Sequence, residues 1–316
     1  PEENAGQATK MKISSGLAFP TFLLVLGGTA YGSIFSANKL AVDAGMPALA
    51  LAFWQVVTAA AVMLPISIVM RSPPRLSFPH LRVYAFVATV GLSGPTMIVV
   101  VLADKLSPAI ITLAAALIAS ATYLLALAVR AEFFRWLALL GVVLGFGGVL
   151  FIVLPEEGLP ETASAGWVLF ALLLPASAAT NNVFTARLMP EGVNSLSLTA
   201  GLMTLSAILL FIIMMLTDGL VLLTHGGLSA VGPVIWAGGA TVVTYLCFFE
   251  IIRRAGGLFF AQMNYVVVAA GVLWAYIIFG DEPNVWLWAA IIAIALGLAA
   301  MNYSKARAEQ QTQKVS

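Results

Sequence analysis

The side chains of this sequence that could do chemistry are polar groups set inside long apolar segments. The candidates are Ser33, Trp54, Gln55, Asn181, Tyr245, Gln262 and Tyr265. Amides offer donors and acceptors to a zwitterion, hydroxyls can bond a carboxylate or an amine, and a tryptophan face can attract an ammonium group. Because polar groups are costly inside a membrane, we predict that this set binds a small polar solute. The alternative is hydrogen bonding within the protein, as serine and threonine do with carbonyls of their own helix. For Trp54 the alternative is a place in the aromatic belt at the membrane interface.

Two prolines, Pro95 and Pro175, also lie inside apolar segments. Proline lacks a backbone N–H and kinks a helix, so it leaves a carbonyl free for a neighbour or a solute. We therefore predict that both are hinges, with a static bend as the alternative.

Other kinds of chemistry find little support. Only two histidines exist, His80 and His225, and both are expected in loops on opposite sides, so they cannot share a metal or form one triad. The single cysteine, Cys247, cannot build a cysteine-rich metal site. The phosphate-binding pattern GxxxxGK[ST] is absent from the sequence. We predict no metal, no cofactor and no enzyme activity.

Carboxylates are missing where a proton relay would need them. No Asp or Glu lies near the middle of an apolar segment, and Glu250 is the deepest. Arg253 and Arg254 follow Glu250 at helical spacing, which favours a salt bridge over a relay. The predicted mechanism is facilitated diffusion, with proton exchange by another route left open.

Composition shows which elements must position these groups. Of 316 residues, 61% are hydrophobic and 9% are charged, where soluble proteins have about 25% charged residues. Backbone groups in hydrocarbon must be satisfied internally, which favours helices. We predict an all-α integral membrane protein with ten transmembrane helices. Their ranges are 17–42, 48–70, 83–103, 107–129, 136–154, 165–187, 194–217, 229–250, 258–279 and 285–303.

Basic residues predict the orientation of these helices. Of the 15 lysines and arginines, only Lys39 and Lys105 fall on one side, which leaves 13 on the other. The positive-inside rule then places both termini in the cytoplasm. The near-neutral net charge of +1 gives no indication of nucleic-acid binding.

The chain also matches itself at an offset of 149 residues. Phe35-Ser36-Ala37 meets Phe184-Thr185-Ala186, Ser33 meets Asn182, and Thr96 meets Tyr245. Each half holds five predicted helices, an odd number, so the second half must enter the membrane inverted. Inverted repeats are typical of alternating-access transporters, which bind substrate between the halves.

These features resemble the drug/metabolite transporter superfamily, in particular its EamA-type ten-helix members. The resemblance covers nearly the whole chain. It rests on the two five-helix halves, on residues 31–35 with Lys39, and on Glu132 followed by the glycine-rich segment 141–148. Within the superfamily the chain is most similar to the YddG-type amino-acid exporters. The resemblance implies a central cavity surrounded by the first four helices of each half, with the fifth and tenth at the periphery.

The resulting hypothesis is an exporter of amino acids, aromatic and other neutral ones favoured, in the inner (plasma) membrane. Its expected partners are the solute and the lipid bilayer. The alternative is an exporter of other metabolites or drugs. We predict repeats at 17–154 and 165–303, between cytoplasmic tails at 1–16 and 304–316. Oligomeric state stays open, because the small-residue stripes at 141–145 and 289–297 could pack within one chain or between two.

Overall fold

A computed structural model describes residues 2–153, 164–188, 194–217, 219–260, 262–280 and 284–315. Side chains are described for most of these positions, but not for residues 2–18, 152–153, 252–253, 255–258 or 308–315, nor for Ala186 and Phe249. Pro1, Leu154 and Ser316, which end predicted segments, lie outside the described residues.

Every regular element in the described part of the chain is helical, and no strand occurs there. This agrees with the prediction, because a helix satisfies its own backbone groups in hydrocarbon. The elements are α1 (Glu2–Asp43), α2 (Ala48–Val69), α3 (Phe78–Phe86), the π-helix η1 (Val87–Ser93), α4 (Gly94–Ala103), α5 (Pro108–Ala116), α6 (Ile118–Ala128), α7 (Trp136–Val153), α8 (Ala165–Ala171), α9 (Leu173–Leu188), α10 (Ser195–Thr217), α11 (Leu228–Phe260), α12 (Met263–Phe279) and α13 (Val285–Val315).

Eight helical stretches in the described residues are long and apolar enough to cross a membrane, and two shorter apolar helices accompany them. Three of the eight consist of consecutive elements: α3, η1 and α4; α5 and α6; and α8 and α9. The shorter helices are Trp136–Phe151 in α7 and Met263–Phe279, which is α12. Each of these stretches overlaps one predicted segment.

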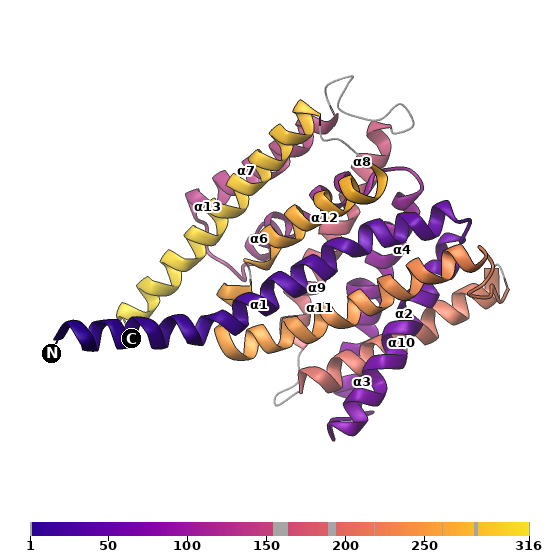
Figure 1. Ribbon diagram of the computed structural model, residues 1–316, viewed down its shortest axis with the longest axis horizontal. Coiled ribbons are helices and arrows are strands. Elements are labelled where there is room, and N and C mark those ends of the chain that lie inside the picture. Colours follow the sequence, from indigo (N-terminus) through magenta and orange to yellow (C-terminus); the bar gives the residue numbers. More distant parts are fainter. Residues whose placement is uncertain are drawn as a thin grey trace.

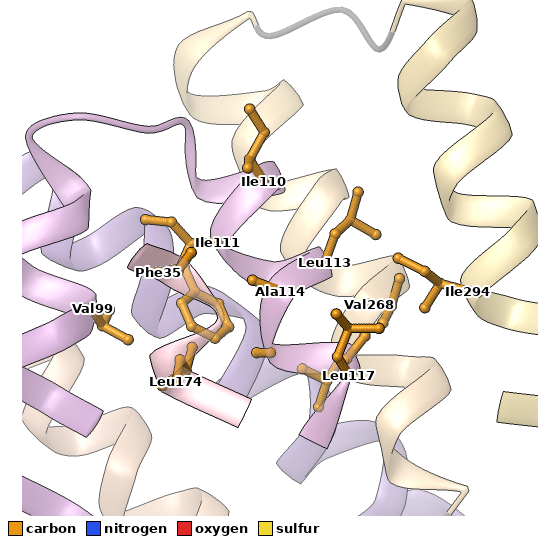
Figure 2. Close-up of a cluster of buried hydrophobic side chains, with 14 of the residues drawn as sticks. Phe35, Val99, Ile110, Ile111, Leu113, Ala114, Leu117, Leu174, Val268 and Ile294 are labelled. Atoms are coloured by element: carbon orange, nitrogen blue, oxygen red, sulfur yellow. The ribbon is translucent and has the colours of Figure 1, made fainter. Parts of the chain in front are cut away.

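The helices pack across the two halves of the sequence. Helix α1 of the first half lies along α11 and α12 of the second, and α2 lies along α10 (Figure 1). Helices α7 and α13 form a pair at one side of the bundle (Figure 1). A buried apolar cluster fills the centre, where Phe35 of α1 lies beside Leu174 of α9 (Figure 2).

Two glycine contacts explain why these helices approach so closely. A Cβ on Gly32 would lie 2.8 Å from the backbone nitrogen of Gly271, so α1 and α12 touch backbone to backbone. In the α7/α13 pair, a Cβ on Gly141 would lie 2.5 Å from the carbonyl oxygen of Gly297. The small-residue stripes of α7 and α13 therefore pack against each other within one chain.

Candidate substrate cavity

A small cavity lies among α1, α2, η1, α4, α9 and α11. Its volume is about 90 Å³. The lining residues are Tyr31, Ile34, Phe35, Gln55, Gly91, Leu92, Pro95, Thr96, Val99, Leu174, Thr241, Thr244 and Tyr245. None of them carries a charge, so the wall offers hydroxyl, amide, aromatic and aliphatic surface only. Both halves of the chain contribute, and α7 and α13 do not.

Gln55 is the most informative polar group in this wall. Its side chain is 5% exposed, and its Nε2 donates a long hydrogen bond of 3.4 Å to Thr241 Oγ1. Thr241 Oγ1 in turn donates to the carbonyl of Ala237 at 2.8 Å. Gln55 Oε1 has no hydrogen-bond partner among the described residues. An unpaired buried acceptor is costly, so a donor brought by a ligand would relieve that cost.

Aromatic rings form another part of the wall. Tyr31 and Phe35 meet edge to face, with ring centroids 5.7 Å apart. Tyr245 contributes a third ring from α11 and contacts Phe248 at 6.4 Å. The cavity therefore combines aromatic surface with hydrogen-bonding groups, which is the usual character of a small-molecule site.

The cavity also reflects the internal repeat. Both repeats place residues with the same offset of 149 in its wall. The pairs are Leu92 and Thr241, Pro95 and Thr244, and Thr96 and Tyr245. Equivalent positions of the two halves thus both contribute to the wall of the cavity.

Proline 95 and the π-helix before it expose a backbone carbonyl to the other repeat. In a π-helix a carbonyl accepts from the N–H five residues later, and for Val90 that residue is Pro95, which has no N–H. Ser177 of α9 donates to the Val90 carbonyl at 2.7 Å and satisfies it. The second predicted hinge, Pro175, is buried in α9 one turn after α8 ends.

Asn181 lies behind one wall of the cavity. A Cβ on Gly91, a lining residue, would lie 2.3 Å from Asn181 Oδ1, so the amide rests directly on that glycine. The same oxygen accepts a hydrogen bond of 3.0 Å from Thr185 Oγ1. Asn182 beside it is exposed and donates to Thr122 Oγ1 at 3.2 Å.

Two predicted residues hold the fold together next to the cavity, outside its lining. Ser33 Oγ donates to the Ala30 carbonyl at 2.7 Å and accepts from Trp236 Nε1 at 3.0 Å, which links α1 to α11. Trp54 Nε1 donates to the Val221 carbonyl at 2.9 Å. Both side chains therefore have hydrogen-bond partners within the protein, which agrees with a structural role and not with solute binding.

Gln262 and Tyr265 lie at the start of α12, away from the lining. Gln262 is exposed, immediately before the helix begins. Tyr265 Oη accepts a hydrogen bond of 3.1 Å from Asn302 Nδ2 of α13. Of the seven predicted binding residues, the structure therefore brings Gln55 and Tyr245 together in the cavity, with Asn181 directly behind the wall.

Sequence reasoning missed Thr96, Phe35 and Leu174 as cavity residues. The repeat carried a usable signal for Thr96, because its equivalent at the offset of 149 is Tyr245, which was a candidate. No such signal marks Phe35 or Leu174, since an apolar residue on a cavity wall looks like any core residue in a sequence this hydrophobic.

Apolar helices long enough to cross a membrane, around an uncharged cavity, are typical of membrane proteins that handle small molecules. The EamA-like transporter family matches residues 18–154 and, a second time, residues 165–303. The chain belongs to this family, which points to a transporter and not to an enzyme. The double match also shows that the chain consists of two EamA repeats.

Other comparisons speak only to the fold. No curated protein matches this sequence. A solved structure titled "Crystal structure of protein" is similar, with 20% sequence identity and a TM-score of 0.58. The match covers 89% of this chain and 96% of that one, so the two share a fold over almost their full lengths.

Proposed function

We propose that this protein exports amino acids, with aromatic and other neutral ones favoured, by alternating access. The observation that carries the proposal is the buried, unpartnered Gln55 Oε1 in an uncharged cavity with aromatic walls. A zwitterion has no net charge, so it needs no charged counterpart in the site. Its ammonium group supplies the donor that Gln55 Oε1 lacks.

The remaining groups suit the rest of such a solute. The hydroxyls of Thr241 and Thr244 already donate to the carbonyls of Ala237 and Ala240 at 2.8 Å. The donor left for the carboxylate is therefore Gln55 Nε2, whose own bond to Thr241 Oγ1 is long at 3.4 Å. Tyr31, Phe35 and Tyr245 offer rings to an apolar or aromatic side chain. A polyamine would bring several charges that no residue of the lining neutralises.

The size of the cavity supports a change of conformation during transport. Small-molecule sites usually enclose roughly 300–1,000 Å³. The cavity here is about 90 Å³. The walls must therefore separate to admit an amino acid, and contacts between the two repeats are the natural place for that movement.

Proton coupling usually uses a carboxylate near the transport path, and the described carboxylates lie elsewhere. The cavity lining contains none, and Glu250 forms an ion pair with Arg254 through Arg254 Nε at 2.5 Å. The Arg253 side chain lies outside the described residues. We therefore propose facilitated diffusion down the solute gradient.

The proposed topology completes this function. Ten crossings, five per repeat, make the repeats at 17–154 and 165–303 inverted. The distribution of 13 against 2 basic residues supports tails at 1–16 and 304–316 on the cytoplasmic side of the inner membrane.

The direct test is uptake of labelled amino acids by sealed liposomes that contain the purified protein, with and without a pH gradient. Movement down the solute gradient that ignores pH supports the proposal. Dependence on the pH gradient would refute facilitated diffusion. Folded protein that moves no amino acid would refute the substrate class and favour other metabolites or drugs.

A further inference from the structure

Several equivalent positions of the two repeats differ in burial, although others, such as Ile34 and Val183, are buried in both. The compared positions lie within residues 33–38 of α1 and 96–99 of α4, with their equivalents on α9 and α11. Ser33, Phe35, Asn38, Thr96 and Val99 are all buried. At the offset of 149, Asn182 and Arg187 are exposed, and Phe184, Tyr245 and Phe248 are only partly buried.

An alternating carrier held in one conformation would show such a difference. Positions related by the repeat occupy corresponding places in the bundle, so a residue that faces lipid in one repeat should face it in the other. Here Ser33, Phe35 and Asn38 of α1 are buried, whereas their equivalents on α9 are exposed or half-buried. Toward the end of α4 the contrast ends, because Leu102 and its equivalent Ile251 are both fully buried. The side of the cavity near Asn38 is therefore the more closed one.

Asn38 stands out on the closed side. It is 0% exposed, and within the described residues neither its Oδ1 nor its Nδ2 has a hydrogen-bond partner. It lies seven residues after Tyr31 and four after Ile34, which puts it on the cavity-facing stripe of α1 at helical spacing. A buried amide without partners is costly, so a purely structural role leaves it unexplained.

We propose that Phe35 and Asn38 form the gate on this side of the cavity, and that Asn38 contacts the solute when the gate opens. Phe35, 2% exposed, closes the cavity in the present state, and Asn38 lies one turn beyond it. In the opposite state the two repeats exchange their roles. The α1 end then gains the exposure that the α9 end has now, and the Asn38 amide meets water and solute in the exit path.

The gate rests on the proposed function only in requiring transport by two alternating states; the solute need not be an amino acid. The movement can therefore be tested without a substrate. Native Cys247, which is buried, is first replaced by alanine. Single cysteines then report access: Asn38→Cys at the gate, Arg187→Cys at its repeat equivalent, and Ala37→Cys as a control. Ala37 is 0% exposed but lies off the cavity-facing stripe.

Accessibility is measured with a membrane-impermeant thiol reagent, added to one face or the other of sealed vesicles. We expect Arg187→Cys to react from its own face in the resting protein. Asn38→Cys should react from the opposite face only, at least about tenfold more slowly, and faster when a transported solute is supplied. Ala37→Cys should stay unreactive throughout. If Asn38→Cys does not fold, Phe35→Cys serves the same purpose.

Two results would overturn the gate: Asn38→Cys reacting at rest as fast as Arg187→Cys, or staying unreactive during demonstrated transport of any solute. If Asn38→Cys reacts with the thiol reagent as expected but the protein moves no amino acid, the gate stands and only the proposed substrate class is refuted. For the solute contact, Asn38→Leu should fold as stably as the original protein and lower transport about tenfold, because one hydrogen bond to a charged group is lost. Unchanged transport by Asn38→Leu would refute that contact.

Discussion

Replacement of Gln55 by leucine should separate transport from stability. The wild-type amide is poorly compensated, since Oε1 has no partner among the described residues and Nε2 donates only a 3.4 Å bond to Thr241. Leucine has a similar size, and Thr241 keeps its 2.8 Å bond to the Ala237 carbonyl. Replacing an incompletely satisfied buried amide by an apolar group is near neutral or stabilising, so we expect a change in unfolding free energy between about 0 and +2 kcal/mol.

Transport should respond in the opposite sense. A hydrogen bond from a solute ammonium group to Gln55 Oε1 is a bond to a charged group, with a net value of roughly 1.5–3 kcal/mol. At about 1.4 kcal/mol per tenfold change, its loss lowers kcat/KM for phenylalanine about 10- to 100-fold. Uptake into liposomes at several concentrations measures this loss, and thermal unfolding in detergent measures stability on the same preparations.

A matched control lies on the same helix. Ser67 of α2 is buried outside the cavity, and its Oγ donates to the Leu64 carbonyl at 2.7 Å. Ser67→Ala removes a buried polar group from α2 without touching the cavity, so uptake should stay within about twofold of the original. Wild-type uptake by Gln55→Leu, or a parallel loss of uptake and stability, would refute the role assigned to Gln55.

Two further predictions concern the packing around the cavity. Gly32→Ala should destabilise the protein by about 1–3 kcal/mol in thermal unfolding, because its Cβ would lie 2.8 Å from the Gly271 nitrogen and 2.9 Å from the Val267 carbonyl oxygen. Gly147→Ala on α7 is the control, because its Cβ would meet nothing within 4 Å, and it should be neutral or stabilising by up to about 1 kcal/mol. Equal losses of stability in Gly32→Ala and Gly147→Ala would contradict the close packing at Gly32. Ser177→Ala leaves the Val90 carbonyl without its 2.7 Å donor and should cost about 1–3 kcal/mol. The cost should shrink in a Pro95→Ala background, which restores an N–H, and a double-mutant cycle without coupling would refute this.

The sequence was sufficient to predict helices and a duplication, because both follow from composition and from the spacing of residue types. Apolar segments of about 20 residues admit few structures in lipid, and the offset of 149 appears as matching residue types. The same offset pairs residues across the cavity wall, such as Thr96 and Tyr245. Such long-range regularities can be detected in a sequence without knowledge of side-chain contacts.

Which polar residues meet in the cavity could not be predicted, because that depends on how each helix is rotated in the bundle. Gln55 and Trp54 are neighbours, yet only Gln55 lines the cavity, and Trp54 bonds to the Val221 carbonyl. Tyr265 looks as suitable as Tyr245 in the sequence, but its hydroxyl is bonded to Asn302. Hydrophobicity does not show which face of such a helix points into the bundle, since lipid and the protein interior are both apolar.

Sequence differences between the two repeats make one part of the cavity wall more polar than the other. Duplication alone would make its two walls alike, but the residues of η1 and α4 at the three paired positions are Leu92, Pro95 and Thr96. Their equivalents on α11 are Thr241, Thr244 and Tyr245. One wall is thus mainly apolar, while the other carries a hydroxyl at every paired position and holds the Gln55 amide through Thr241. A solute with a polar head and an apolar body has one favourable orientation between such walls. A uniformly polar solute would place some of its hydrogen-bonding groups against Leu92 and Pro95, which offer them no partner. Its binding is therefore disfavoured by the free energy of each hydrogen bond that it loses on leaving water.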